Sequence, residues 1–278
     1  MTVQTRGLES SVLPGDPGAE MYELTRELYP ICRSLTGDGV RRTLEIISRE
    51  APFELTEIPT GTRVFDWTVP PEWNVREGWI ADASGRRLVE FRDCNLHVLG
   101  YSVPVRARVS LEDLRPHLFT LPDHPAWIPY RTSYYHENWG FCLSHRDLES
   151  LAEGDYDVCI DASLQDGHLT YAELLLPGAS SAEVLISSYI CHPSVCNDGL
   201  SGVALVTMLA KHLGSLSRRY SYRFLLSPGT IGPLTWLSRN EERLPLIRHG
   251  LVASCVGDSG MVTYKKSRQG NAEVDRAA

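Results

Sequence analysis

A histidine and an aspartate stand six residues apart in the segment CHPSVCND, and both residue types can bind a metal. The segment follows AEVLISSYI (182–190), an apolar run typical of a buried strand. It precedes LSGVALVTMLAKHL (200–213), whose apolar residues recur at helical spacing. Imidazole and carboxylate groups are common zinc ligands, so His192 and Asp198 are candidate ligands.

Two further strand-like runs end in turns that could complete such a site. YSYRFLLS (220–227) leads into SPGTIG, and GLVASCVG (250–257) leads into Asp258 of GDSG. Ligands of open α/β sheets bind outside the carboxyl ends of the strands. We therefore expect His192, Asp198 and Asp258 to converge at one edge, where a zinc ion would keep water as its fourth ligand.

The same residues also fit a purely structural interpretation. Asn-Asp-Gly at 197–199 is a good turn, and Asp198 could cap the helix at 200–213 by accepting from its first N–H groups. GDSG could equally be only a turn, and His192 could be an ordinary loop residue. Residue types and spacing leave both interpretations open.

The elements that must position these residues are read from the pattern along the chain. Strand-like and helix-like runs alternate from Asp155 onward, which indicates parallel βαβ units. Short β-type runs broken by Pro, Gly and Asn fill residues 66–150, with five of the six tryptophans between 67 and 139. We predict an α/β fold with a mainly parallel sheet flanked by helices, and an inserted β-rich module.

The predicted domain boundaries follow from these changes in the pattern of strand-like and helix-like runs. They are a flexible tail at 1–19, an α/β domain made of 20–62 and 155–278, and the inserted module at 63–154.

Composition limits the class of protein. The net charge is −8, from 27 basic and 35 acidic residues, and no dense basic stripe is present, so nucleic acid is not an expected partner. Seven cysteines without a CxxC pair indicate free thiols in a reducing compartment. Neither a signal-peptide pattern nor a run of eighteen apolar residues is found, so we expect a cytoplasmic protein without a membrane partner.

Several long motifs resemble one known family. ISSYICHPSVCNDGLSGVA, RFLLSPGTIG and SCVGDSGMVTYKKSRQGNAEVDRA closely resemble a bacterial aminopeptidase-like family of unassigned function. That family is related to the co-catalytic zinc exopeptidases of clan MH, which include the bacterial leucyl aminopeptidases. PYRTSYYHENWGFCLSH (129–145) and VFDWTVPPEWNV resemble the same family, the latter within its inserted β-rich module. The resemblance spans roughly residues 20–278.

The resemblance implies roles for the three candidate ligands. In the zinc aminopeptidases, a histidine after the first motif strand binds one zinc, which corresponds to His192. The aspartate of an Asn-Asp pair bridges two metals, which corresponds to Asp198. An aspartate at the end of a later strand binds the first zinc, which corresponds to Asp258.

The sequence also departs from the pattern of those peptidases. A Glu-Glu pair, the first the general base and the second a zinc ligand, is replaced by Gly229 and Thr230. Ser194 stands where an aspartate follows the ligand histidine, and a final histidine ligand is expected beyond VDRAA, where this sequence stops. The resemblance therefore implies one zinc site and makes a second doubtful.

Other side chains near these motifs are weaker candidates. Those that could line a substrate site are Thr230, His136, Lys265 and Lys266. The two lysines could bind a carboxylate or phosphate, but an ordinary exposed loop explains them as well. Cys191 and Cys196 flank the site and could ligate zinc or act as nucleophiles, or be structural thiols.

Two functions from different classes fit the sequence. The first is a zinc-dependent aminopeptidase-like hydrolase, with an incomplete catalytic site, acting on a small peptide or another amide-containing molecule. The second is a non-hydrolytic metal- or ligand-binding protein on a peptidase scaffold. Gly229 discriminates between them, because a carboxylate there would support the first and its absence supports the second.

Overall fold

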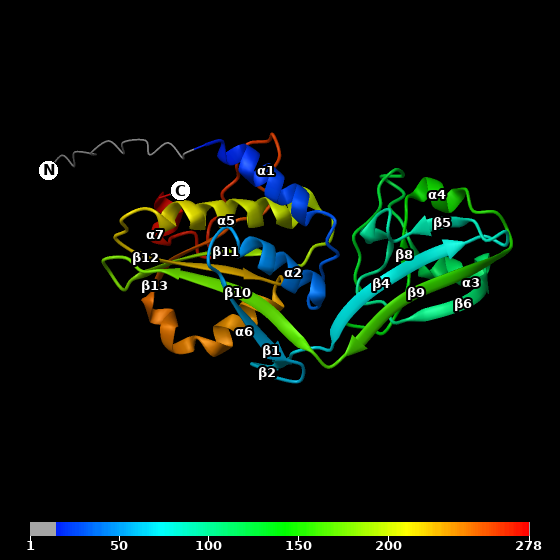
Figure 1. Cartoon of the computed structure of the whole chain (residues 1–278), viewed down its shortest axis with the longest axis horizontal. Helices are drawn as coiled ribbons and strands as arrows, with labels where there is room; N and C mark the ends of the chain where they lie inside the picture. The colour runs from blue at the N-terminus through cyan, green and yellow to red at the C-terminus, as the bar shows by residue number, and fades with distance from the viewer. Residues whose placement is uncertain (1–14, 278) are drawn as a thin grey trace.

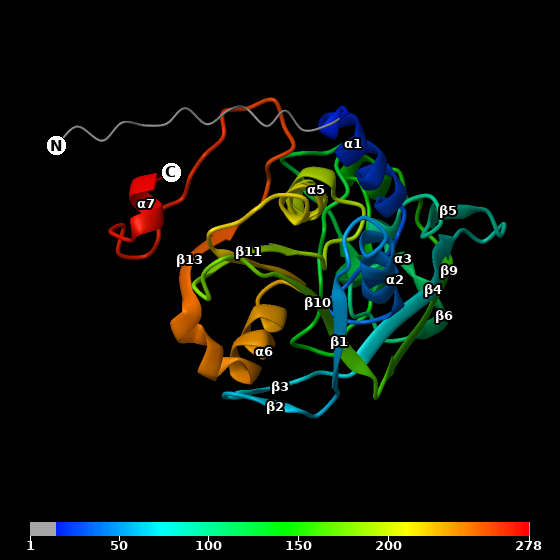
Figure 2. The ribbon, with the colours of Figure 1, turned by 60° about the vertical axis from the view of Figure 1, so that its left-hand side comes forward.

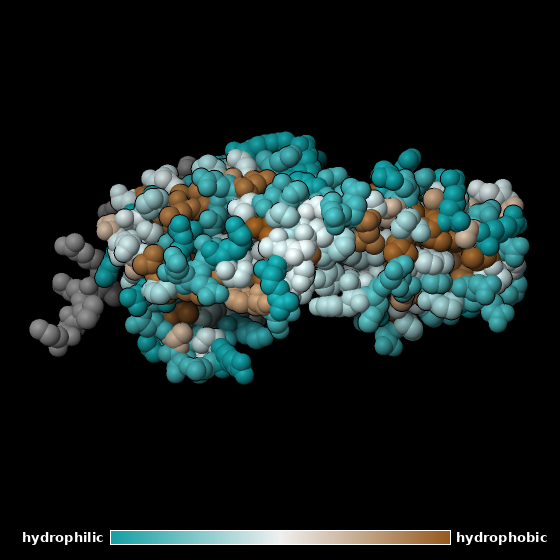
Figure 3. Space-filling view, turned by 90° about the horizontal axis from the view of Figure 1, so that it is seen from below, coloured by the Kyte–Doolittle hydropathy of each residue, from teal (hydrophilic) through white to brown (hydrophobic). Residues whose placement is uncertain are grey.

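The computed structural model describes residues 15–277, which form two lobes (Figure 1). Most of the predicted tail at 1–19 lies outside these residues, and helix α1 begins at Pro17. One lobe is an α/β layer structure, and the other is built around a smaller sheet. Figure 3 shows a largely hydrophilic face with separate hydrophobic patches on both lobes. No helix within residues 15–277 is long and apolar enough to cross a membrane.

The α/β lobe is built on a five-stranded sheet with the order β1-β10-β12-β11-β13. Its strands are β1 (Glu54–Pro59), β10 (His168–Leu176), β12 (Ser221–Ser227), β11 (Glu183–Tyr189) and β13 (Ile247–Val252). The three strands expected at 182–190, 220–227 and 250–257 are β11, β12 and β13, and β11 pairs in parallel with both neighbours. The last of them begins earlier than expected, at Ile247.

The sheet is mixed rather than mainly parallel, which corrects the sequence prediction. β1 pairs antiparallel with β10, and β10 pairs antiparallel with β12. The parallel strands β11, β12 and β13 are linked by helical crossovers through α5 (Ser201–Gly214) and α6 (Ile231–Arg239). β10 instead enters the sheet directly from a strand of the second lobe, so no crossover helix sets its direction.

Helices cover both faces of this sheet (Figures 1 and 2). α1 (Pro17–Leu28), α2 (Asp38–Ile47) and α5 lie on one face, and α6 lies on the other. Consecutive side chains of β12 point alternately to these two faces and pack in the hydrophobic core on each. Phe224 and Leu226 pack with α1, α2 and α5, whereas Leu225 packs with Trp236 of α6. This period-two alternation is the signature of a strand buried on both faces.

The second lobe contains a four-stranded sheet with the order β5-β4-β9-β6, in which every pairing is antiparallel. Its strands are β5 (Arg87–Glu90), β4 (Glu72–Ala81), β9 (Asp155–Gln165) and β6 (Val105–Ser110). Short elements complete the lobe: η1 (Asn95–His97), α3 (Leu111–Leu114), η2 (Arg115–His117), β7 (Leu118–Phe119), β8 (Phe141–Cys142) and α4 (His145–Glu149). Because β9 pairs here, this sheet extends beyond residue 154; the domain division itself stays a prediction.

The remaining short elements belong to the α/β lobe. They are β2 (Arg63–Val64), β3 (Trp67–Thr68), η3 (Cys196–Leu200), η4 (Glu241–Leu246) and α7 (Glu273–Ala277).

A buried ion pair joins β11 to β12 near the start of β11. Arg223 donates from Nε and Nη2 to the two carboxylate oxygens of Glu183, at 2.7 and 2.9 Å. Both side chains are almost fully buried, with 2% and 5% of their surface exposed, and Glu173 approaches Arg223 at 3.3 Å. Buried charges of this kind are stable only as a complete set, since each loses its hydration.

We expect Glu183→Gln to lower the free energy of unfolding by about 3–5 kcal/mol, because it leaves Arg223 buried with only part of its counter-charge. Urea denaturation followed by circular dichroism measures this change. The matched control is Glu45→Gln at the exposed Arg42–Glu45 pair, where the two side chains are 55% and 58% exposed. That change should cost less than about 1 kcal/mol. Equal losses in the two variants would contradict the assignment.

Candidate active site at the carboxyl ends of the parallel strands

His192 and Asp198 come together beyond the carboxyl end of β11. The two residues flank a loop that turns back at η3, where Asp198 (φ −84°, ψ 89°) and Gly199 (φ 117°, ψ −71°) depart from helical geometry. Gly199 takes this positive φ without steric cost. His192 Nδ1 lies 3.4 Å from Asp198 Oδ2 and 3.2 Å from the backbone oxygen of Asp198. Asp198 is therefore not the cap of α5, whose N-cap Leu200 has no side-chain cap bond.

The other carboxylate oxygen of Asp198 is engaged by a tyrosine. Tyr189, the last residue of β11, donates its hydroxyl hydrogen to Asp198 Oδ1, and Ser254 Oγ lies 2.6 Å from the same hydroxyl. Burial, and then the bond to Asp198, raise the pKa of Tyr189 above its ordinary value. Tyr189 is thus protonated at neutral pH and acts as a donor. Cys255 Sγ lies 3.7 Å from the same Asp198 oxygen.

The ring of His192 is flanked by two aromatic rings. The centroids of Tyr189 and Tyr130 each lie 4.9 Å from that of His192, with tilted planes. Tyr130 comes from the long connection between β7 and β8 of the second lobe. Both lobes therefore contribute to the surroundings of His192.

A buried arginine holds the backbone at His192. Arg33 is 1% exposed. Its Nε donates to the His192 carbonyl oxygen at 3.0 Å, and its Nη1 donates to the carbonyl oxygen of Leu28 at 2.6 Å. Its Nη2 has no hydrogen-bond partner among the described residues. Burial lowers the pKa of Arg33 to about 10, so it remains charged at neutral pH.

Asp258, the third expected ligand, does not join the pair. It accepts hydrogen bonds from Asn197 Nδ2 and from the backbone N–H of Gly260, both at 2.7 Å, and it is exposed. Gly257 N–H donates to Asn197 Oδ1 at 2.8 Å, so the chain after β13 is tied to the residue before Asp198. The structure thus brings two of the three predicted ligands into contact, and the assignment of all three as ligands stays a prediction.

Gly229 and Thr230, which the resemblance puts in place of the Glu-Glu pair, follow β12, and Gly229 lies beside Cys191 and Tyr189. Gly229 N–H donates to Cys191 Sγ at 3.2 Å. A Cβ at position 229 would lie 3.3 Å from that sulfur and 3.6 Å from Tyr189 Cβ, so a side chain there would start next to the site. Thr230 has φ 63° and ψ −57°, and Ile231 N–H donates to the oxygen of Gly229 at 2.9 Å. This tight, strained turn leads directly into α6.

The weaker candidates lie in different environments. His136 is exposed and its backbone N–H donates to Ser133. Lys265 and Lys266 are exposed, in a segment held by the bonds of Asp275 to Tyr264 and Ser267. Cys191 is buried and Cys196 is exposed. A role for these residues in binding a substrate stays a prediction.

Sequence patterns pointed to His192 and Asp198 but missed three of their neighbours. Tyr189 and Tyr130 lie inside the matched motifs SSYICHP and PYRTSYYHENW, where their position was the available signal. Arg33 lies in the connection between two helices and carries no motif, so only its burial reveals it.

The His192–Asp198 pair fits zinc as two of its ligands. Tetrahedral zinc with bonds of about 2.1 Å holds its donors roughly 3.4 Å apart, which matches the separation of His192 Nδ1 and Asp198 Oδ2. Across the described part of the chain, no group of three or more His, Cys, Asp and Glu side chains is placed to hold a metal. The described residues therefore bring together two donors at a separation that zinc would require, and the metal site stays a prediction.

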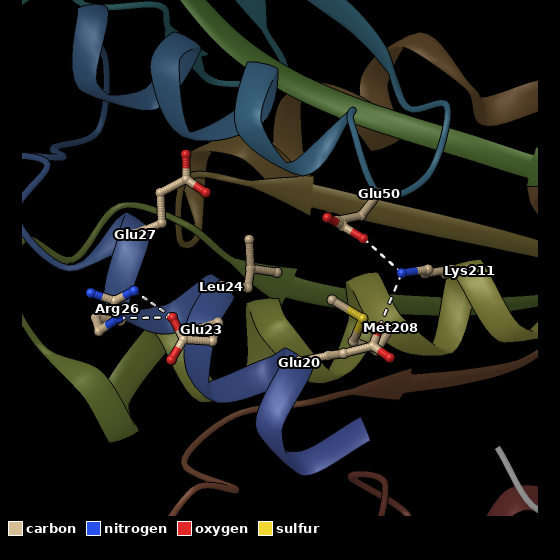
Figure 4. Close-up of a pocket in the computed structure, with 8 residues that line it drawn as sticks. All are labelled: Glu20, Glu23, Leu24, Arg26, Glu27, Glu50, Met208 and Lys211. Carbon is tan, nitrogen blue, oxygen red and sulfur yellow. Dashed lines mark hydrogen bonds and ion pairs between the residues drawn. The ribbon is translucent and has the colours of Figure 1, made fainter. Parts of the chain in front are cut away.

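Two surface pockets lie close to α1 and α5. The one in Figure 4 is lined by charged side chains, but Lys211 pairs with Glu20 and Glu50, and Glu23 and Glu27 pair with arginines. These paired charges leave no evident binding group. The other pocket, of 400 Å³ and mainly apolar, borders the motif loop at Cys196 and Asn197.

This mixed α/β fold resembles that of the zinc aminopeptidases. A zinc aminopeptidase from Bacillus subtilis superposes with a TM-score of 0.56 over 87% of this chain and 69% of its own, at 12% identity, which shows the fold alone. The chain belongs to the family described as "Domain of unknown function (DUF4910)", whose sequence model matches residues 22–278.

Two Clostridium acetobutylicum comparisons are much closer in sequence. A protein named "Putative polysaccharide biosynthesis protein with aminopeptidase-like domain" is 51% identical over 261 residues, which cover 94% of this chain and 60% of that protein. A crystal structure described as a "putative peptidase" from the same organism has a TM-score of 0.92 at 52% identity, covering 93% of this chain and 61% of its own. This chain thus spans about three fifths of the length of these relatives.

The thiols around the site should differ in reactivity. Burial raises the pKa of Cys32 and of Cys142 to about 12, and it also raises the pKa of Cys191. At about pH 8 these thiols stay protonated, so a disulfide reagent should modify the exposed Cys196 and Cys255 first. Mass spectrometry of the labelled protein identifies the sites.

Cys196→Ser and Cys255→Ser should each remove one fast-reacting thiol, whereas unfolding should release the slow ones. Rapid labelling of Cys191 in the native protein would show that this part of the site is open.

Proposed function

We propose that this chain holds one zinc ion and binds a small peptide or another amide-containing molecule at the His192–Asp198 edge, with little or no hydrolysis. The observation that carries the proposal is Gly229, which has no side chain and stands beside Tyr189, the tyrosine that donates to Asp198. A general base contributes about 10²–10⁴-fold to such reactions. The scaffold is that of a peptidase, but its proton acceptor is missing.

Neighbouring carboxylates are poor replacements for the missing base. Asp198 already faces Tyr189 and His192 with its two oxygens. Glu241 is exposed, in η4 beyond the end of α6. Neither Asp198 nor Glu241 therefore offers an unengaged carboxylate next to residue 229.

The zinc would be held by His192 and Asp198, with Asp258 as a third ligand. Asp258 lies in an exposed segment one loop away and would have to exchange its bond with Asn197 for the metal. Bound zinc would polarise an amide carbonyl and lower the pKa of its water. The chain itself would orient the ligand between the loop after β11 and Tyr130 of the second lobe.

A zinc-dependent hydrolase acting on a peptide or amide is the second candidate. It is favoured by the separation of His192 Nδ1 and Asp198 Oδ2, which suits a zinc ion, and by the aminopeptidase fold. The name of the Clostridium relative suggests a role in polysaccharide biosynthesis for that longer protein. An amide-bearing sugar would then be one ligand to test alongside peptides.

Restoring the missing carboxylate separates the two functions. The unaltered chain should bind at most one zinc and hydrolyse aminoacyl amides very slowly or not at all. Gly229→Glu should raise the rate, by up to about 10²–10⁴-fold, because it supplies a base beside the pair. The 3.3 Å approach of its Cβ to Cys191 Sγ requires only a small shift. Elemental analysis and a chromogenic aminopeptidase assay measure both quantities.

Gly229→Gln is the matched control, since it adds a side chain of the same shape without a basic carboxylate. It should remain as slow as the unaltered chain. Two tightly bound zinc ions, or peptidase-like turnover by the unaltered chain, would contradict the proposal.

A further inference from the structure

We propose that Tyr189, itself held by Ser254, is a positioning residue that turns Asp198 toward His192. This inference rests on the proposed function in one respect, namely that the His192–Asp198 pair is the site that binds zinc. No motif correspondence assigns this role to either residue. The backbone at Asp198, the bonds of the Tyr189 hydroxyl and the register of the sheet support this role.

The backbone at Asp198 does not by itself turn the side chain toward His192. Its backbone lies in the non-helical kink of η3, followed by a glycine with positive φ. Its side chain is 48% exposed. An exposed carboxylate on such a turn can adopt several rotamers, and solvent would stabilise the outward ones. A hydrogen-bond donor on the other carboxylate oxygen would therefore help to select the observed orientation.

The Tyr189 hydroxyl is that group. It donates to Asp198 Oδ1, which leaves Oδ2 directed at His192 Nδ1. The other nearby contact of Oδ1, Cys255 Sγ at 3.7 Å, comes from a weak donor. Since Tyr189 is the better donor, it determines the rotation of the carboxylate.

The sheet holds Tyr189 and Ser254 in fixed relation. Tyr189 pairs with Ser227 at the end of the parallel β11–β12 ladder. Ala253 N–H donates to the Ser187 oxygen at 2.9 Å, which continues the β11–β13 pairing up to Ser254. Ser254 Oγ can thus donate to the Tyr189 oxygen, at 2.6 Å, while Tyr189 donates onward to Asp198. The sheet thus fixes Tyr189 and Ser254 at the strand ends, and these two residues orient Asp198 in the loop after β11.

Tyr189→Phe tests the hydroxyl without disturbing the ring. The phenylalanine ring retains the packing against His192, at 4.9 Å between centroids, and loses only the donor. We expect zinc affinity to fall by about 10–100-fold, as is usual when a group that orients a metal ligand is removed. Ser254→Ala should cause a smaller loss in the same direction. Competition with a chromogenic zinc chelator measures the dissociation constants.

Tyr156→Phe is the matched control, because its hydroxyl donates to the Ala152 oxygen at 2.6 Å in the second lobe. It should leave zinc affinity unchanged. Unfolding midpoints of all the variants should show that any loss of affinity is not a loss of fold. Unchanged or tighter zinc binding by Tyr189→Phe would overturn the inference.

A metal-free crystal structure of Tyr189→Phe tests the role of Tyr189 independently of zinc binding. The inference expects Asp198 Oδ2 to move away from His192 Nδ1, beyond the present 3.4 Å. An unchanged separation would refute it. This measurement decides the role of Tyr189 even if the unaltered chain binds no zinc, a result that would contradict the proposed function alone.

Discussion

The parallel pairing of β11 with both β12 and β13 is the constraint on which the rest of the structure depends. Parallel neighbours end at the same edge, so the segments after Tyr189, Ser227 and Val252 must leave the sheet side by side. The loop with His192 and Asp198, the turn at Gly229 and the segment containing Ser254 all start from this edge. At the opposite end, the buried Arg223–Glu183 pair fixes the register of β11 against β12.

The candidate site is a joint product of the two lobes and of the connection between α1 and α2. The second lobe supplies Tyr130 against the His192 ring, and the connection supplies Arg33 to the His192 carbonyl oxygen. A buried cation with an unpartnered nitrogen is costly, so its presence under this loop indicates that a fixed backbone at His192 matters to the molecule. The second lobe is therefore part of the surroundings of the site.

The His192–Asp198 pair and position 229 differ in the side chains that they offer. His192, Asp198 and the side chains behind them keep a separation suited to a metal, whereas position 229 keeps its place without a functional group. The Gly229 backbone needs no positive φ, and the nearest neighbours of an added Cβ would be the Cys191 sulfur at 3.3 Å and the Tyr189 side chain at 3.6 Å. The absence of a carboxylate is thus a change of side chain and not of backbone.

Local patterns in the sequence were sufficient for the elements and for the motif. The alternation of apolar runs and helical spacing after residue 182 predicted β11, α5, β12, α6 and β13, and it predicted their parallel order, because such periodicities are set by neighbouring residues. The spacing of His192 and Asp198 within one short turn was readable for the same reason. The expectation that Gly229 takes the place of a general base came from the resemblance alone, and it stays a prediction.

Only the tertiary structure decided the contacts that depend on the path of distant segments. The antiparallel entry of β10 follows from its link to β9, and the bond of Asp258 to Asn197 follows from the course of the chain after β13. The choice of Asp198 between a cap and a partner of His192 was settled by the Tyr189 hydroxyl. The burial of Arg33 depends on what packs over it. These contacts depend on the packing and desolvation of residues that are far apart in the sequence, and a local pattern of residues does not determine them.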